Sequence, residues 1–253
     1  MRSYTTPPLY SVRDDGNVLW AGGRHLLRVV SQERVTTIVT ASTKRGGRNP
    51  QILDILTAPQ GGVFIACRCE RLDGRRVGAF AHVRTNGAVE RDWDPARFDT
   101  ASVGRKVLVD SRITYLAARG SDYVQAVRTT TGKSLWKTDT NGQVQAVASL
   151  EDRLVVGGHW RIGQSYCQPR LAALDPATGD LDRSWTPAPN PDYAGVWALA
   201  VTSDGSMWAG GKFAKLGTDW SRNGLACDYI DGDQTRPAAV EPNVWVRSLV
   251  RLT

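Results

Sequence analysis

The sequence has little cysteine and histidine, and it contains no long hydrophobic run. Only 4 of its 253 residues are cysteine, too few for a disulfide scaffold in a chain of this size. No apolar run approaches the roughly 18 residues that a membrane-spanning helix needs, so we expect no membrane partner. The first residues, MRSYTTPPLYSV, place two prolines where a signal peptide has its apolar stretch. We therefore expect synthesis in the cytoplasm without a signal peptide.

Signatures of catalysis and cofactor binding are missing as well. The sequence contains no GxSxG, HExxH or P-loop motif, and it predicts no cofactor. His159 occupies the repeat position that Lys212 holds in a later copy, which favours a surface side chain over a general base. No segment has the apolar period of an amphipathic helix. The sequence therefore predicts an all-β protein.

The charge is strongly positive, with 32 lysines and arginines against 25 acidic residues and a net charge of +7. Such a balance favours an anionic partner, for example nucleic acid, a phosphorylated glycan or an acidic protein surface. Arginine is spread along the chain rather than gathered in one block, which is also what a generally basic composition produces. Both interpretations remain open at this stage.

One short phrase recurs five times along the chain. Aligned on a small residue near its end, the copies read NVLWAGG at 17–23, GVFIACR at 62–68, ITYLAAR at 113–119, RLVVGG at 153–158 and SMWAGG at 206–211. The anchor residues are Gly22, Cys67, Ala118, Gly157 and Gly210, which are 45, 51, 39 and 53 residues apart. Periods of this length are typical of propellers and arrays.

Each copy has the same internal order. An apolar run forms the first strand, and a tight Gly turn connects it to the second, or anchor, strand. A longer loop then leads to the third strand, and a Gly turn leads to the fourth. The fourth strand carries a tryptophan in three copies, Trp93, Trp136 and Trp185. This order is typical of a four-stranded antiparallel meander. A glycine pair late in the anchor strand would let a neighbouring sheet pack closely.

The sequence thus predicts one domain, a five-bladed β-propeller of four-stranded antiparallel blades. We place the blades at 9–40, 51–93, 105–138, 143–185 and 195–253. The last blade is expected to take its third strand from 248–253 and to carry an insertion at 214–247. Residues 1–6 would then supply its missing fourth strand and clasp the chain ends together; the alternative is a frayed N-terminus.

The segments GGHWRIGQSYCQPRLAALDPATGDLDRSW at 157–185 and VWALAVTSDGSMWAGGKFAKLG at 196–217 resemble the delta-sixty propeller repeat of actinobacterial and actinophage proteins. The match to "GG-x-aromatic" followed by "R-LA-x-LD-x-x-TG" is good in the fourth copy, partial in the fifth and only general in the first three. The resemblance implies a β-propeller used as a recognition or scaffold module, without catalytic residues to transfer. It also suggests a phage tail or host-recognition component of a virion.

The two kinds of connection in the predicted blades differ in length. Turns between strands one and two, and between three and four, are short and contain glycine, whereas the other loops are long and varied: 40–51, 68–78, 94–105, 158–169, 186–195 and 214–247. Elaborated loops on a rigid scaffold carry recognition. The candidate ligand-binding residues in and beside these loops are aromatic or basic: Trp220, Tyr229, Trp245, Tyr193, Tyr166, Arg45, Arg48, Arg75 and Arg76. Trp160 and Phe213 occupy equivalent repeat positions and are interpreted as packing residues.

Aromatic side chains with nearby arginines suit a glycan, a protein partner or single-stranded nucleic acid. We favour a non-catalytic, lectin-like module that binds a cell-surface glycan or a partner protein, within a larger complex. The alternatives are a nucleic-acid-binding propeller and a glycosidase-like enzyme. The enzyme would need two carboxylates within about 10 Å of each other in a tunnel, for which Asp54 and Asp110 are the only candidates.

Three further features receive weaker interpretations. Asp228, Asp231 and Asp233 could hold Ca²⁺, but their spacing is not that of an EF-hand, so an acidic turn is preferred. Cys167 and Cys227 lie in corresponding loops and could form a disulfide in an oxidising environment. The Cys67-Arg68-Cys69 segment has no second Cys or His pair nearby and is not expected to bind zinc.

Overall fold

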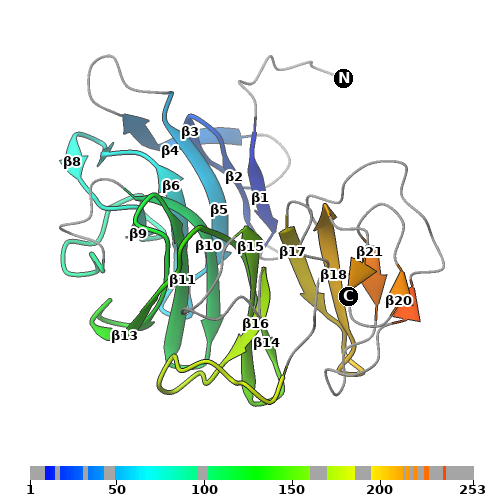
Figure 1. Cartoon of the computed structure of the whole chain (residues 1–253). Coiled ribbons are helices and arrows are strands. Elements are labelled where there is room, and N and C mark those ends of the chain that lie inside the picture. The colour runs from blue at the N-terminus through cyan, green and yellow to red at the C-terminus, as the bar shows by residue number, and fades with distance from the viewer. Residues whose placement is uncertain are drawn as a thin grey trace, which may run out of the picture. The chain divides into compact units, whose positions relative to one another are not determined.

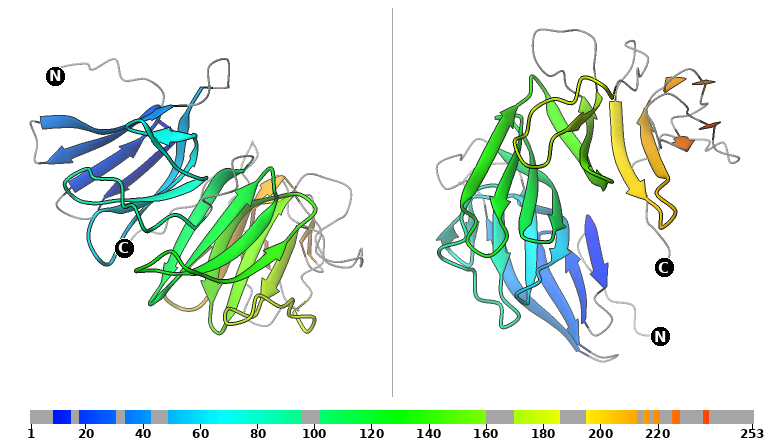
Figure 2. Two further views of the ribbon diagram at one scale, coloured as in Figure 1. Left: turned by 90° about the vertical axis from the view of Figure 1, so that its left-hand side faces the viewer. Right: turned by 90° about the horizontal axis from the view of Figure 1, so that it is seen from below.

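The computed structural model describes residues 9–14, 18–30, 34–42, 49–95, 102–159, 170–185, 195–212, 215–216, 219–220, 225–227 and 236–237. For 26–30, 34–39 and the segments after 212, only the backbone is described. This part of the chain consists of β-strands and turns, with no helix among them. The strands pair in antiparallel sheets (Figures 1 and 2). The all-β prediction is therefore confirmed.

The chain divides into two compact units. Unit 1 comprises Met1–Ser121 and Val127–Ser134, and unit 2 comprises Asp122–Ala126 and Leu135–Thr253. Each unit has its own buried core. In unit 1, Trp20, Ile52 and Ile65 belong to one apolar cluster, and in unit 2 Trp185 and Met207 belong to another.

The first sheet of unit 1 begins as a four-stranded meander and is extended by a hairpin from later in the chain. Its order is β1-β2-β3-β4-β7-β8. The strands are β1 (Ser11–Asp14), β2 (Val18–Gly22), β3 (His25–Val30), β4 (Arg34–Ser42), β7 (Arg71–Leu72) and β8 (Arg75–Arg76). The predicted boundaries of the first repeat did not include this hairpin.

The second and third repeats form two further sheets. One has the order β5-β6-β9, with β5 (Gln51–Thr57), β6 (Val63–Arg68) and β9 (Phe80–Val83). The other has the order β10-β11-β12-β13, with β10 (Val103–Asp110), β11 (Ile113–Arg119), β12 (Tyr123–Arg128) and β13 (Ser134–Asp139). The fourth strand expected to carry Trp93 is reduced to a single bridge between Val83 and Val89.

Unit 2 contains the sheets of the fourth and fifth repeats and a short separate hairpin. The fourth repeat has β14 (Gln143–Leu150), β15 (Arg153–His159) and β16 (Leu171–Leu174), in that order. The fifth has the order β17-β18-β21-β22, with β17 (Gly195–Val201), β18 (Met207–Lys212), β21 (Leu225–Cys227) and β22 (Arg236–Pro237). The hairpin pairs β19 (Lys215–Leu216) with β20 (Asp219–Trp220). The fourth strand expected to carry Trp185 is reduced to a single bridge between Leu174 and Leu181.

The strand beside β18 differs from the sequence expectation. The prediction assigned this position to 248–253 and treated 214–247 as an insertion, whereas β21 lies inside that range and aligns Trp208 with Cys227. A three-residue strand has too short an apolar pattern to be recognised from the repeat. Residues 1–6 and 248–253 lie outside the described residues, so the clasp between the chain ends stays a prediction.

The same β-bulge recurs in the first strand of four repeats. The register shifts between Ile52 and Asp54, between Gly104 and Lys106, between Val144 and Ala146, and between Val196 and Ala198. The extra residues are Leu53, Arg105, Gln145 and Trp197. A bulge leaves one residue out of the ladder and bends the strand. The anchors Cys67 and Ala118 pair with the residue before the bulge, whereas the anchors Gly157 and Gly210 pair with the residue after it. The sequence alignment therefore matches the structural repeat to within one residue.

The glycines of the anchor strands allow close packing against the next sheet in the chain. A Cβ atom on Gly22 would lie 2.7 Å from Ile52 Cγ2, and one on Gly157 would lie 2.8 Å from Val196 Cγ1. Contacts this short do not occur between real side chains without a shift of the neighbour. The predicted role of the glycine pair in close packing is confirmed at these two positions.

Two repeat tryptophans attach their repeat to the Gly turn of the following one. Trp93 Nε1 donates a hydrogen bond to Thr129 O at 2.8 Å, and Trp136 Nε1 donates one to Pro176 O at 2.9 Å. Gly132 ends the first of these turns, with a positive φ of 66°, and its α-carbon faces the Trp93 ring. This contact gives Trp93 and Trp136 the same role in their repeats.

Candidate functional site

Each sheet has two chemically different ends. At one end, the first strand begins opposite the end of the second, as in the pairs Gln51–Arg68, Val103–Arg119 and Gln143–His159. We call this the loop end. At the other, the turn end, the connections are tight. Ser111 and Glu151 have positive φ in two of these turns, and the others use glycines with positive φ: Gly61, Gly62, Gly87, Gly132, Gly179 and Gly205. The predicted recognition loops follow the loop ends.

In unit 1, the loop after β6 is folded into the hairpin of β7 and β8. Leu72 pairs with Arg75, and the connecting residues Asp73 and Gly74 have φ of 47° and 76°. Two consecutive positive φ values are the signature of a type I′ turn, for which Asp-Gly is a preferred sequence. The loop at 68–78 is therefore a defined element rather than an irregular connection.

Backbone pairing joins this hairpin to β4. Ala41 pairs with Leu72, whose side chain is fully buried. At the hairpin turn, Asp73 N donates to Thr40 O at 2.9 Å, and Thr40 N donates to Asp73 Oδ1 at 2.7 Å. The hairpin is thereby fixed at both its stem and its tip.

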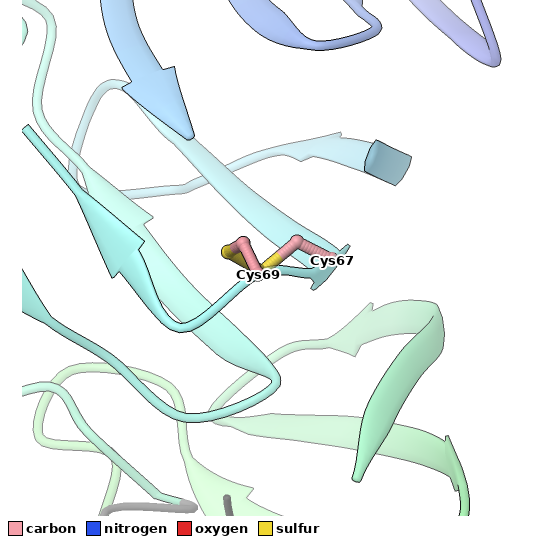
Figure 3. The surroundings of a disulfide bond; sticks show 2 residues. All are labelled: Cys67 and Cys69. Atoms are coloured by element: carbon pink, nitrogen blue, oxygen red, sulfur yellow. A yellow bond between two sulfur atoms is a disulfide. The ribbon is translucent and has the colours of Figure 1, made fainter. Parts of the chain in front are cut away.

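A disulfide between Cys67 and Cys69 lies at the base of the hairpin (Figure 3). The two Cα atoms are 5.4 Å apart, and both side chains are buried. The sequence pattern excluded a zinc site at these two cysteines but did not predict this bond. Residues i and i+2 of an extended strand lie nearly 7 Å apart, at the upper limit of normal disulfide geometry. Because β6 ends at Arg68, the chain bends and the bond can form. No free thiolate is left there for a metal.

The two predicted arginines of the hairpin have different surroundings. Arg75 is half-buried, and its guanidinium donates to Val89 O at 3.2 Å and to Arg91 O at 2.9 Å. Its hydrogen bonds therefore tie the hairpin to the backbone that follows β9. Arg76 is exposed, so its side chain is accessible to a ligand.

Most of the other predicted site residues lie outside the described residues, and their roles stay predictions. These are Arg45, Arg48, Tyr166, Tyr193, Tyr229, Trp245, Asp228, Asp231, Asp233, Cys167, Trp160 and Phe213. Trp220 lies on β20 and Cys227 on β21, where only the backbone is described.

The two carboxylates considered for a glycosidase have separate surroundings. Asp54 accepts hydrogen bonds from Lys106 Nζ at 3.0 Å and from Val107 N at 2.9 Å, so both its oxygens bind β10. Asp110 is exposed at the end of that strand. The enzyme alternative would gain support if both carboxylates pointed into one tunnel. The exposure of Asp110 argues against such an arrangement. Across the described ranges, no group of three His, Cys, Asp or Glu side chains could hold a metal ion.

A shallow pocket lies at the turn end of the second repeat, but its charged and imidazole side chains are engaged with other lining residues. It is lined by Gln60, Gly61, His82, Arg84, Thr85, Asn86 and Glu90. Arg84 forms an ion pair with Glu90, which lowers the pKa of Glu90. The buried His82 ring lies with Nε2 2.8 Å from Gly61 O, and burial lowers the pKa of this imidazole. These contacts indicate a structural role.

Sequence comparison identifies no relative: no protein-family model matches, and no curated protein does. Solved structures do match. The computationally designed protein Ika8 gives a TM-score of 0.62 at 10% identity, over 97% of this chain and 65% of its own length. The WD40 β-propeller domain of Doa1 gives 0.56 at 14% identity, over 95% and 71%. The Pan2 WD40 domain of Neurospora crassa gives 0.56 at 11%, over 90% and 64%.

The fold is similar to that of β-propellers. The likeness at such low identity concerns the fold alone, and the chain spans about two thirds of the length of the proteins it matches. Because no family model matches, the resemblance to the delta-sixty repeat stays a prediction. Among the described residues, no helix is long and apolar enough to cross a membrane.

Proposed function

We propose that this chain is a non-catalytic recognition module in which five repeats close into a five-bladed β-propeller. Its ligand is a cell-surface glycan, bound at the loop ends of the sheets. The delta-sixty resemblance supports a propeller of this size and suggests a phage tail or host-recognition component as its setting. A partner protein is the second candidate, because exposed arginines such as Arg76 also anchor protein interfaces.

The observation that carries the proposal is the difference between the two ends of the sheets. The turn ends are closed by tight turns, most of which contain a glycine with positive φ. The loop end of the third repeat is also a short turn, with Gly120 between β11 and β12, whereas the loop end of the second repeat carries a hairpin with a disulfide at its base. A binding loop that is already ordered loses little conformational entropy when the ligand arrives. An exposed loop that is held in one conformation by a hairpin and a disulfide is expected where the loop binds a ligand.

The proposal is tested by applying the purified chain to a glycan array at two salt concentrations. We expect binding to a restricted set of glycans, and weaker binding after Arg76→Ala. The matched control is Arg91→Ala, because Arg91 is also exposed but contributes to the hairpin contact only through its backbone carbonyl. Retained binding by the Arg91 variant would localise the effect to the hairpin.

The salt series separates this function from nucleic-acid binding. A protein that makes 6–10 phosphate contacts loses roughly 10³–10⁵ in affinity between 50 and 200 mM salt. A glycan held by stacking and a few hydrogen bonds changes far less. An empty array, together with steeply salt-dependent binding to single-stranded nucleic acid, would reject the proposal.

A further inference from the structure

Arg105 is the bulge residue in the first strand of the third repeat. Gly104 pairs with Ala118 and Lys106 pairs with Ala117, so Arg105 is left out of the ladder at the loop end of β10. The equivalent residues of the other repeats are Leu53, Gln145 and Trp197. The bulge itself therefore does not require a charge, and the guanidinium is particular to this repeat.

The guanidinium of Arg105 is largely withdrawn from solvent without a counter-charge. Its Nε atom is buried and has no hydrogen-bond partner. Across the described residues, the ion pairs include neither Arg105 nor Arg119, and the neighbouring carboxylate, Asp54, is already bound to Lys106. Burial lowers the pKa of Arg105, and the nearby charges of Arg119 and Arg68 lower it further. A buried, unpaired cation is costly unless an anion joins it.

Strand packing brings the three arginines to one place. Arg119 ends β11 opposite the start of β10, and Arg68 ends β6. The two sheets approach closely here, because a Cβ atom on Gly104 would lie 3.0 Å from Cys67 N and 2.2 Å from Ala79 O. Arg105 follows Gly104, and Arg68 follows Cys67, so both arginines lie next to this close contact between the sheets.

We propose that Arg105, Arg119 and Arg68 form an anion-binding site for an oxyanion group, such as the carboxylate, sulfate or phosphate of an acidic glycan. Guanidinium groups bind such oxyanions through paired hydrogen bonds. The site lies on the same loop end of unit 1 as the hairpin. Its assignment to a glycan rests on the proposed function, whereas anion binding by the three arginines is testable on its own.

The first test uses inorganic phosphate as the probe and thermal unfolding of the whole chain as the readout. Low millimolar phosphate is compared with chloride at equal ionic strength, for the wild type and for Arg105→Gln, Arg119→Gln and the control Arg91→Gln, whose side chain is exposed. We expect phosphate to raise the Tm of the wild type and of the Arg91 variant. The apparent affinity should be at least tenfold weaker in the Arg105 and Arg119 variants.

The Arg105 variant also provides an internal check of folding. Because it removes a buried unpaired charge, it should unfold at the same or a higher temperature than the wild type in chloride. Equal phosphate responses in all four proteins would overturn the anion site. A lower Tm in chloride, with an unchanged phosphate response, would also overturn it, because Arg105 would then act only in packing.

The second test compares neutral, sulfated and carboxylated glycans on the same array. Preference for the acidic glycans, lost in Arg105→Gln, supports the inference. Binding to neutral glycans alone, unaffected by this substitution, would reject the inference but keep the proposed function. A phosphate response with no glycan binding would keep the anion site and reject the proposed function.

Discussion

Single residues connect the repeats through hydrogen bonds between side chains and turn carbonyls. Trp93 is almost completely buried, and its ring lies 4.6 Å from that of Phe64, centroid to centroid. Its indole also reaches the turn of the next repeat at Thr129. One side chain thus packs within its own repeat and holds its neighbour.

The hydrogen bond of Trp93 can be tested with a substitution that keeps most of the ring. Trp93→Phe removes the indole N–H and leaves Thr129 O without this donor. We expect the free energy of unfolding to fall by about 1–3 kcal/mol in urea titrations. Trp136→Phe is the control, since this ring is only half-buried and should lose less. If Trp136→Phe lowered the free energy of unfolding more than Trp93→Phe, burial would not explain the strength of the Trp93 hydrogen bond.

His82 predicts a pH dependence of stability. Burial lowers its pKa in the folded chain below that in the unfolded chain, about 6.5. Between the two pKa values the unfolded chain binds more protons, so stability is complete above pH 6.5 and falls as the pH drops through that window. The free energy of unfolding, measured in urea at pH 7.5 and at pH 5, should differ less between the two pH values for His82→Gln than for the wild type. An identical difference would exclude His82 as the cause.

Residue patterns predicted some of these roles and missed others. The close packing at Gly22 and Gly157 follows from the absence of a side chain, which is visible in the sequence. Arg105 could not be identified, because strict alternation does not reveal the extra residue of a bulge. Only the pairing of Gly104 and Lys106 with adjacent residues of β11 shows that Arg105 lies outside the ladder.

At the scale of elements, strands with several apolar residues were predicted well, and short ones were not. The runs that became β5, β10, β14 and β17 are visible in the sequence because their period of two spans seven or eight residues. The hairpin of β7 and β8 has strands of two residues. Its pairing with β4 depends on a contact distant in sequence, which no local pattern contains.

The disulfide at the base of this hairpin should contribute modestly to stability. The loop that it closes contains only one residue between Cys67 and Cys69, so the entropic contribution is about 1–2 kcal/mol. We expect a small decrease in Tm for the double variant Cys67→Ser and Cys69→Ser. Mass spectrometry after alkylation of the unfolded, unreduced chain provides the direct test. Alkylation of Cys67 and Cys69 without prior reduction would show that the bond is absent.

At the scale of the whole molecule, the repeat count and the match to propellers agree with a closed ring, while closure itself remains a proposal. If residues 1–6 pair beside 248–253, dyes attached at the two chain ends should show high energy transfer, and denaturant should abolish it. A variant without 248–253 should unfold at a lower temperature, because its first strand would lose a partner. Low transfer in the native chain would exclude the clasp.

The hydrogen bonds from Trp93 and Trp136 to the turns that follow them also affect how a chain of this kind can gain or lose a repeat. Trp93 and Trp136 reach turns of similar sequence, TTTG and PATG, through a backbone carbonyl. A carbonyl is available whatever side chains the turn carries. If residues 94–136 were deleted, Trp93 would meet the turn at 176–179 instead of the turn at 129–132. Genetic duplication or loss of a unit can therefore leave the joint between neighbours chemically intact.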